Sequence, residues 1–252
     1  MAPVSSGFMA APYVFIDLPK TGNSPLLSHL AKHLVWNEGI VYLGPLGDRQ
    51  RHREGRPDLS VWSPTRRKQI RFITGPNVST SSHELTGADE GRYFTVLRDP
   101  AEQWVAEYNA SRDRDDGLPT FWDWYGDRRV NQTTRRLKVF LSAKTADEIA
   151  ETLKGFWFVA TTEHLAEDAP FLLREIGVPD DYAARGDPED GLDDADAALT
   201  SDIYPATGRT GPHLEMTDEI RERIYSDHIR DRQLYKLALE WRASKRTRYG
   251  WD

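Results

Sequence analysis

Short apolar runs alternate along the chain with longer segments of helical periodicity. Five runs rich in β-branched and aromatic residues, each bounded by polar, Gly or Pro residues, predict strands at residues 13–18, 40–44, 69–74, 92–97 and 156–161. Helical spacing of apolar residues predicts helices at residues 24–36, 101–112, 128–142, 146–153, 163–176 and 217–244. Strands that alternate with helices in this way predict an α/β fold, in which helices cover both faces of a central parallel sheet.

The length of 252 residues is enough for one large α/β domain or for two small ones. No internal repeat is found, and we expect a single domain over residues 1–252. Two segments have the composition of loops. Residues 44–64 place four arginines among Gly and Pro, and residues 179–211 are acidic and poor in large apolar side chains. We expect the second segment to be a flexible loop.

Composition excludes several kinds of protein. A net charge of −7 argues against a nucleic-acid surface over the whole molecule, although a local basic pocket for an anion remains compatible with it. The absence of cysteine excludes disulfides, thiolate nucleophiles and cysteine zinc sites. No apolar run approaches the roughly 18 to 20 residues that span a bilayer, and the N-terminus lacks the pattern of a secretory signal. We therefore expect a cytoplasmic protein without a membrane or nucleic-acid partner; its oligomeric state stays open.

The first predicted strand runs through the loop LPKTGNSP, residues 18–25, into the first predicted helix. A helix N-terminus presents unpaired N–H groups and a partial positive charge, which suit a phosphate. Gly22 allows close approach to an oxyanion, and Lys20 supplies a cation. The small polar residues of the loop add possible side-chain hydrogen bonds: Thr21, Asn23 and Ser24. A plain strand–turn–helix connection is the alternative, and the lysine position differs from that of a Walker A loop.

A second candidate anchor ends the fourth predicted strand, in the sequence RYFTVLRDP, residues 92–100. Arg98 falls at the carboxyl edge of the sheet, where ligand sites of α/β proteins gather. Its guanidinium suits bidentate pairing with a second phosphate group, and a structural salt bridge is the alternative.

Taken together, five segments in order resemble the sulfotransferase family that includes heparan sulfate 2-O-sulfotransferase and bacterial relatives. They are VFIDLPKTGNS (14–24), YFTVLRDPAEQWVAEYNASR (93–112), NQTTRRL (131–137), FWFVATTEHLAEDAPFLLREIG (156–177) and DRQLYKLA (231–238). The resemblance implies an α/β fold with a P-loop-NTPase-like central parallel β-sheet. It also implies that 3′-phosphoadenosine-5′-phosphosulfate is the donor, held by Lys20, Thr21, Gly22, Asn23 and Ser24 at the phosphosulfate and by Arg98 at the 3′-phosphate.

Three positions depart from the pattern of that family. A serine that relatives carry eight residues after the arginine is Ala106 here, and Asn109 or Ser111 is a possible substitute. A Gly-His pair, whose histidine is a candidate general base, reads as glycine followed by Pro76. A histidine before the loop lysine is replaced by Asp17.

The implied reaction is in-line attack of a hydroxyl or amine on sulfur, with the nucleotide as leaving group. Lys20 and the loop amides neutralise the growing charge, so no metal is expected. His83 is our candidate general base, because its segment is where relatives keep histidines and because histidine is a residue type suited to proton transfer near neutral pH. Glu84 and Asp17 are carboxylate alternatives, and a solvated loop histidine is the alternative reading of His83.

Other residues have two readings each. Arg209 is a possible late-loop contact to the nucleotide phosphate or an ordinary surface arginine. His29 and His33 lie four apart on one helix face, a spacing found in metal sites, but no third ligand is evident and surface histidines are the simpler reading. The aromatic run at residues 121–125 either forms an acceptor wall or packs a helix onto the sheet.

These observations favour a sulfotransferase acting on a small-molecule or carbohydrate acceptor. A degenerate nucleotide-binding or regulatory protein of the same fold is the first alternative, motivated by Pro76 and Ala106. A P-loop kinase is the second alternative, and the misplaced lysine counts against it.

Overall fold

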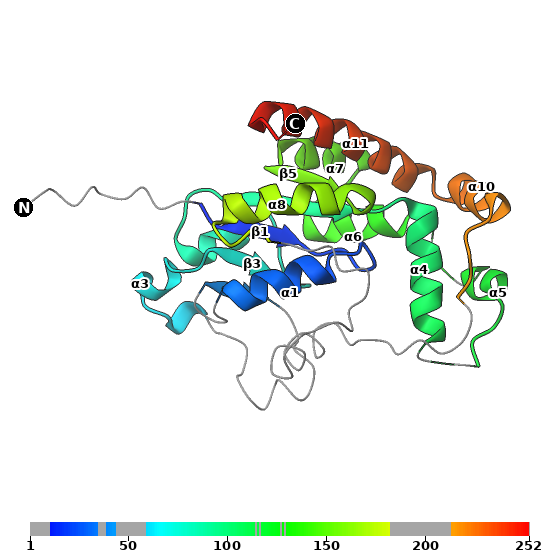
Figure 1. Cartoon of the computed structure of the whole chain (residues 1–252), viewed down its shortest axis with the longest axis horizontal. Coiled ribbons are helices and arrows are strands. Elements are labelled where there is room, and N and C mark those ends of the chain that lie inside the picture. The colour runs from blue at the N-terminus through cyan, green and yellow to red at the C-terminus, as the bar shows by residue number, and fades with distance from the viewer. Residues whose placement is uncertain are drawn as a thin grey trace, which may run out of the picture.

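A parallel β-sheet forms the centre of the protein (Figure 1). The computed structural model describes residues 11–34, 39–43, 59–113, 115, 117–126, 128, 130–181 and 213–251. Its strands are β1 (Tyr13–Ile16), β2 (Ile40–Tyr42), β3 (Phe72–Thr74), β4 (Arg92–Leu97) and β5 (Phe158–Thr161). They lie in the order β2-β3-β1-β4-β5, and each of the four neighbouring pairs is parallel.

Alternate residues of each strand face opposite layers of helices. In β1, Tyr13 and Phe15 belong to one buried cluster, whereas Val14 and Ile16 belong to another. The first cluster contains residues of α1 (Ser24–His33) and α8 (Leu165–Ile176). The second contains residues of α6 (Gln132–Phe140), α7 (Ala146–Gly155) and α11 (Ile229–Tyr249). The prediction of an α/β fold, with a central parallel sheet and helices on both faces, is therefore confirmed.

A third cluster lies apart from the sheet. It is formed by α4 (Pro100–Arg112), α5 (Phe121–Gly126) and α10 (Asp218–Asp227), which stand together at one end of the molecule in Figure 1. The aromatic run 121–125 makes up most of α5, and three of its rings are buried against α4 and α10. Of the two readings of this run, the one in which it packs a helix onto the sheet is thus corrected, because its partners are two other helices.

The predicted helix at 217–244 is two helices that meet at His228. The side chain of His228 is fully buried, and its Nδ1 accepts hydrogen bonds from the Asn131 backbone N–H (2.9 Å) and the Trp104 indole N–H (3.4 Å). Its backbone leaves the helical region, with φ −110° and ψ 42°. These contacts with distant residues turn the chain between α10 and α11.

Another difference concerns the segment at 69–74, where only the second half is a strand. The N–H groups of Gln69 and Ile70 donate to the carbonyls of Arg66 and Arg67 (3.0 and 3.2 Å), and so complete the turn after α3 (Pro64–Arg67). Most of residues 44–64 and 179–211 lie outside the described residues.

The strand order creates a switch point between β1 and β4. The chain leaves β1 toward β2 at one side of the sheet, and leaves β4 toward β5 at the other. Ligands of open α/β sheets bind in the crevice that such a divergence leaves at the carboxyl ends of the strands. Within the described part of the chain, no helix combines the length and apolarity that crossing a bilayer requires.

Candidate functional site

The loop LPKTGNSP connects the carboxyl end of β1 to α1, directly at the switch point. Lys20 and Gly22 both adopt left-handed backbone conformations, with φ of 63° and 70°. A Cβ on Gly22 would stand 3.0 Å from the side-chain methyl of Thr162, so glycine is favoured there by space as well as by backbone conformation. The chain then enters α1 at Ser24, with Pro25 in the first helical turn.

Three successive carbonyls of the loop are bound by the surrounding scaffold. The Pro19 carbonyl accepts from the Gln103 amide (2.9 Å), the Lys20 carbonyl from Arg98 Nη1 (3.2 Å), and the Thr21 carbonyl from the Thr162 hydroxyl (2.7 Å). In a planar trans peptide the C=O and the following N–H point in opposite directions. The N–H groups of residues 20, 21 and 22 therefore point away from these three donors. Successive N–H groups in a turn with left-handed residues, such as Lys20 and Gly22, are typical of anion-binding concavities.

Two predicted ligand side chains of the loop form hydrogen bonds to residues at its start. The Thr21 hydroxyl donates to the Leu18 carbonyl (2.8 Å), and the Asn23 amide donates to Asp17 Oδ1 (2.6 Å). Both Thr21 and Asn23 are buried. Because the Asn23 side chain is turned to Asp17, no side chain caps α1, and the first N–H groups of the helix keep their capacity for an external anion. Half-buried Ser24 stands at the same helix end.

Arg98 lies beside this loop, directly after β4. Its Nη1 is bound to Lys20, while its Nε is buried and has no hydrogen-bond partner in the described part of the chain. A buried guanidinium N–H without an acceptor is costly unless a ligand satisfies it. Its position beside the loop fits a second anionic group of the same ligand.

Sequence reasoning missed the two other residues that bind the loop carbonyls, Gln103 and Thr162. Gln103 is buried and is itself fixed by the Thr133 hydroxyl, which donates to its side-chain oxygen (2.8 Å). Thr162 directly follows β5. Its place as a polar residue at the carboxyl end of a predicted strand is the sequence feature by which it could have been recognised.

Two tyrosines fix the carboxylates that follow β4 and β5. Tyr225 donates to Asp99 Oδ2, and Tyr235 donates to Glu163 Oε2 (2.8 Å). Burial, reinforced by the bond to Asp99, raises the pKa of Tyr225 to about 12. Burial and the bond to Glu163 raise the pKa of Tyr235 further still. Both hydroxyls therefore remain protonated donors throughout the neutral range and tie the carboxyl end of the sheet to α10 and α11.

The structure does not bring His83 together with the loop. His83 lies in the 3₁₀ helix η2 (Ser82–Thr86), and its Nδ1 is 2.7 Å from the hydroxyl of Tyr93, the second residue of β4. Arg98 follows the other end of that strand, about 17 Å further along at roughly 3.3 Å per residue. Glu84 is exposed in the same 3₁₀ helix. Of the three predicted bases, only half-buried Asp17 adjoins the loop, through its bond to Asn23.

Both predicted substitutes for a serine at Ala106 form hydrogen bonds within the protein. Asn109 forms two hydrogen bonds with the Leu214 backbone, at 3.0 and 2.8 Å, and the Ser111 hydroxyl donates to the Glu107 carbonyl (2.8 Å). Arg209 falls outside the described residues.

Comparisons with known proteins give matches to solved structures alone. No protein-family model matches the chain, and no curated protein matches it. Several solved structures do, among them the crystal structure of a sulfotransferase from Alicyclobacillus acidocaldarius. That match has a TM-score of 0.47 and 17% sequence identity, and covers 92% of this chain and 99% of the other.

Proposed function

We propose that this protein transfers the sulfuryl group of 3′-phosphoadenosine-5′-phosphosulfate to a hydroxyl or amine of a small-molecule or carbohydrate acceptor. The observation that carries the proposal is the loop whose Pro19, Lys20 and Thr21 carbonyls are all bound to the scaffold. In the proposal, the N–H groups that follow these carbonyls bind an anion together with the uncapped N-terminus of α1. The resemblance of the five sequence segments to sulfotransferases supports 3′-phosphoadenosine-5′-phosphosulfate as the source of that anion.

In this proposal, the donor's phosphosulfate lies against the loop and its 3′-phosphate against Arg98. The acceptor oxygen or nitrogen forms a bond to sulfur while the bond from sulfur to the bridging oxygen breaks. Negative charge grows on that bridging oxygen, and the Lys20 ammonium and the loop N–H groups stabilise it. The acceptor's proton passes to a general base.

We assign the base role to Asp17 rather than to His83. Asp17 directly follows β1, and its carboxylate is bonded to Asn23 within the loop itself. Burial raises the pKa of Tyr42, at the carboxyl end of β2, and the nearby Asp17 carboxylate raises it further, in line with a position of Asp17 at this edge of the sheet. His83, by contrast, is paired with Tyr93 near the start of β4.

A second candidate is a nucleotide-binding protein of the same fold that transfers nothing. The placement of His83 favours it, together with the engagement of Asn109 by Leu214. Such a protein would keep the anion-binding loop and Arg98 but would lack turnover.

The test is transfer of label from donor carrying ³⁵S in the sulfuryl group to a panel of hydroxyl and amine acceptors. We expect labelled product with the unmodified protein, and a loss of about 10²- to 10⁴-fold in Asp17→Asn, the range typical of a removed general base. His83→Ala is expected to retain the rate. Calorimetry of nucleotide binding to Asp17→Asn separates a lost base from a distorted loop, because only distortion weakens binding as well.

Two results would decide against this account. Absence of labelled product with every acceptor, together with intact nucleotide binding, would support the non-transferring alternative. A rate that falls in His83→Ala and survives in Asp17→Asn would reverse the assignment of the base.

A further inference from the structure

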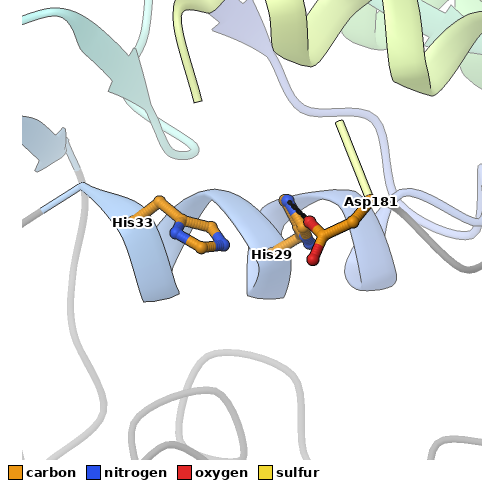
Figure 2. Close-up of side chains that lie close together, drawn as sticks. All are labelled: His29, His33 and Asp181. Atoms are coloured by element: carbon orange, nitrogen blue, oxygen red, sulfur yellow. Dashed lines mark ion pairs between the residues drawn. The ribbon is translucent and has the colours of Figure 1, made fainter. Parts of the chain in front are cut away.

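Two histidines of α1 lie close to an aspartate that follows α8 and is distant from them in sequence. His29 and His33 are one helical turn apart, and their rings lie 4.8 Å apart, centroid to centroid. The Asp181 carboxylate comes from the segment that follows α8, and its Oδ1 is 3.7 Å from His29 Nε2. Figure 2 shows the two imidazoles along the same helix with the carboxylate beside His29.

The spacing of these groups suits a metal ion. One ligand atom from each of the three residues lies within 4.8 Å of the other two. Two ligands of a tetrahedral ion, each at about 2.1 Å from the metal, are roughly 3.4 Å apart. The separation of 3.7 Å between His29 and Asp181 is already near this value, and His33 is exposed and able to adjust.

A backbone oxygen completes the set. The Pro179 carbonyl lies 2.8 Å from His29 Nε2, where it accepts a hydrogen bond when that nitrogen is protonated. A metal at Nε2 replaces this hydrogen bond, the ring proton then resides on Nδ1, and the carbonyl becomes available as an oxygen ligand. Two imidazole nitrogens with carboxylate and carbonyl oxygens form a mixed donor set that suits Zn²⁺, Cu²⁺ or Ni²⁺ better than Mg²⁺ or Ca²⁺.

We propose that His29, His33 and Asp181 form a site for a divalent transition-metal ion, with Zn²⁺ as the reference ligand. Such an ion connects α1, whose N-terminus carries the anion-binding loop, to the segment after α8. The site is thus structural, distinct from the proposed sulfuryl transfer and independent of it. From the sequence alone, only the histidine pair could be recognised. The third ligand could not, because Asp181 is 148 residues from His33.

The test is calorimetric titration of the metal-free full-length protein with ZnCl₂, combined with thermal unfolding at increasing Zn²⁺. We expect one ion per chain at this site and a melting temperature that rises with Zn²⁺, because a ligand specific for the folded state stabilises it. His33→Ala and Asp181→Asn are each expected to weaken binding by about 10-fold or more. Mg²⁺ is expected to produce neither effect.

The matched control is His213→Ala. His213 Nε2 lies 3.1 Å from Asp113 Oδ1, so it reproduces one histidine–aspartate pair, and the cluster at α1 is the single group of three such side chains found among the described residues. We expect this variant to bind Zn²⁺ like the unmodified protein. Unchanged binding in a His29→Ala/His33→Ala double variant, or equal loss in His213→Ala, would overturn the proposal. Because His33 and Asp181 are exposed, neither substitution removes a buried contact that folding requires.

Discussion

Lys20→Ala is expected to reduce the rate of sulfuryl transfer by about 10²- to 10³-fold, the effect typical of removing one group that stabilises transition-state charge. Lys20 occupies the loop between two carbonyls that are bound to the scaffold, and its own carbonyl is held by Arg98. Alanine retains a Cβ at this left-handed position, so the substitution removes the ammonium without adding backbone strain. The measurement is the initial rate of label transfer at saturating donor.

The control for Lys20→Ala is Lys32→Ala. Lys32 is exposed in the last turn of α1, at the opposite end of the helix from the loop, and its removal lowers the net charge equally. We expect its transfer rate to stay close to that of the unmodified protein. Equal rates for Lys20→Ala and the unmodified protein would show that the loop lysine takes no part in the transition state.

Asp168→Asn is expected to lower the free energy of unfolding by about 3–5 kcal/mol, the range for breaking a buried ion pair by removing one partner. Asp168 in α8 is fully buried, and its two oxygens accept hydrogen bonds from Arg242 Nε (2.7 Å) and Nη2 (2.9 Å). Arg246 Nη1 donates to the same carboxylate (2.7 Å). Loss of the charge leaves two arginines of α11 without their shared buried partner. Urea denaturation, analysed as a two-state transition, measures the change.

Glu167→Gln provides the matched control for this network. Glu167 Oε2 also accepts from Arg242 (2.8 Å), but its side chain is exposed, so solvent screens the interaction. We expect little change in unfolding free energy. If the two variants unfolded at the same urea concentration, the buried carboxylate would not be what joins α8 to α11.

Local signals were sufficient for the strand β4 and its continuation into α4. Arg92–Leu97 is a compact apolar run, and Asp99 and Pro100 then start a helix in which the Asp99 carboxylate accepts from the N–H groups of Ala101 and Glu102. The position of β4 and the start of α4 both follow from residues that are neighbours in sequence. The same reasoning located the loop at residues 18–25 and placed Arg98 at the carboxyl edge of the sheet.

Long-range contacts decided the features that sequence reasoning missed. Thr162 is 141 residues from Thr21, whose carbonyl it binds, and Gln103 is 84 residues from Pro19. His83 was expected at the site because its segment is where relatives keep histidines. In a parallel sheet, however, the chain between β3 and β4 must return from the carboxyl to the amino end, and this return carries His83 away from the loop to Tyr93.

The most direct measurement of the donor site is calorimetric titration with 3′-phosphoadenosine-5′-phosphate and with adenosine 5′-phosphate. We expect the bisphosphate to bind more tightly, because only its additional 3′-phosphate reaches Arg98, whose buried Nε otherwise has no partner among the described residues. In Arg98→Ala this preference is expected to disappear while binding of adenosine 5′-phosphate persists. Equal affinity of the unmodified protein for both nucleotides, or binding of neither, would contradict a phosphosulfate donor site between the loop and Arg98.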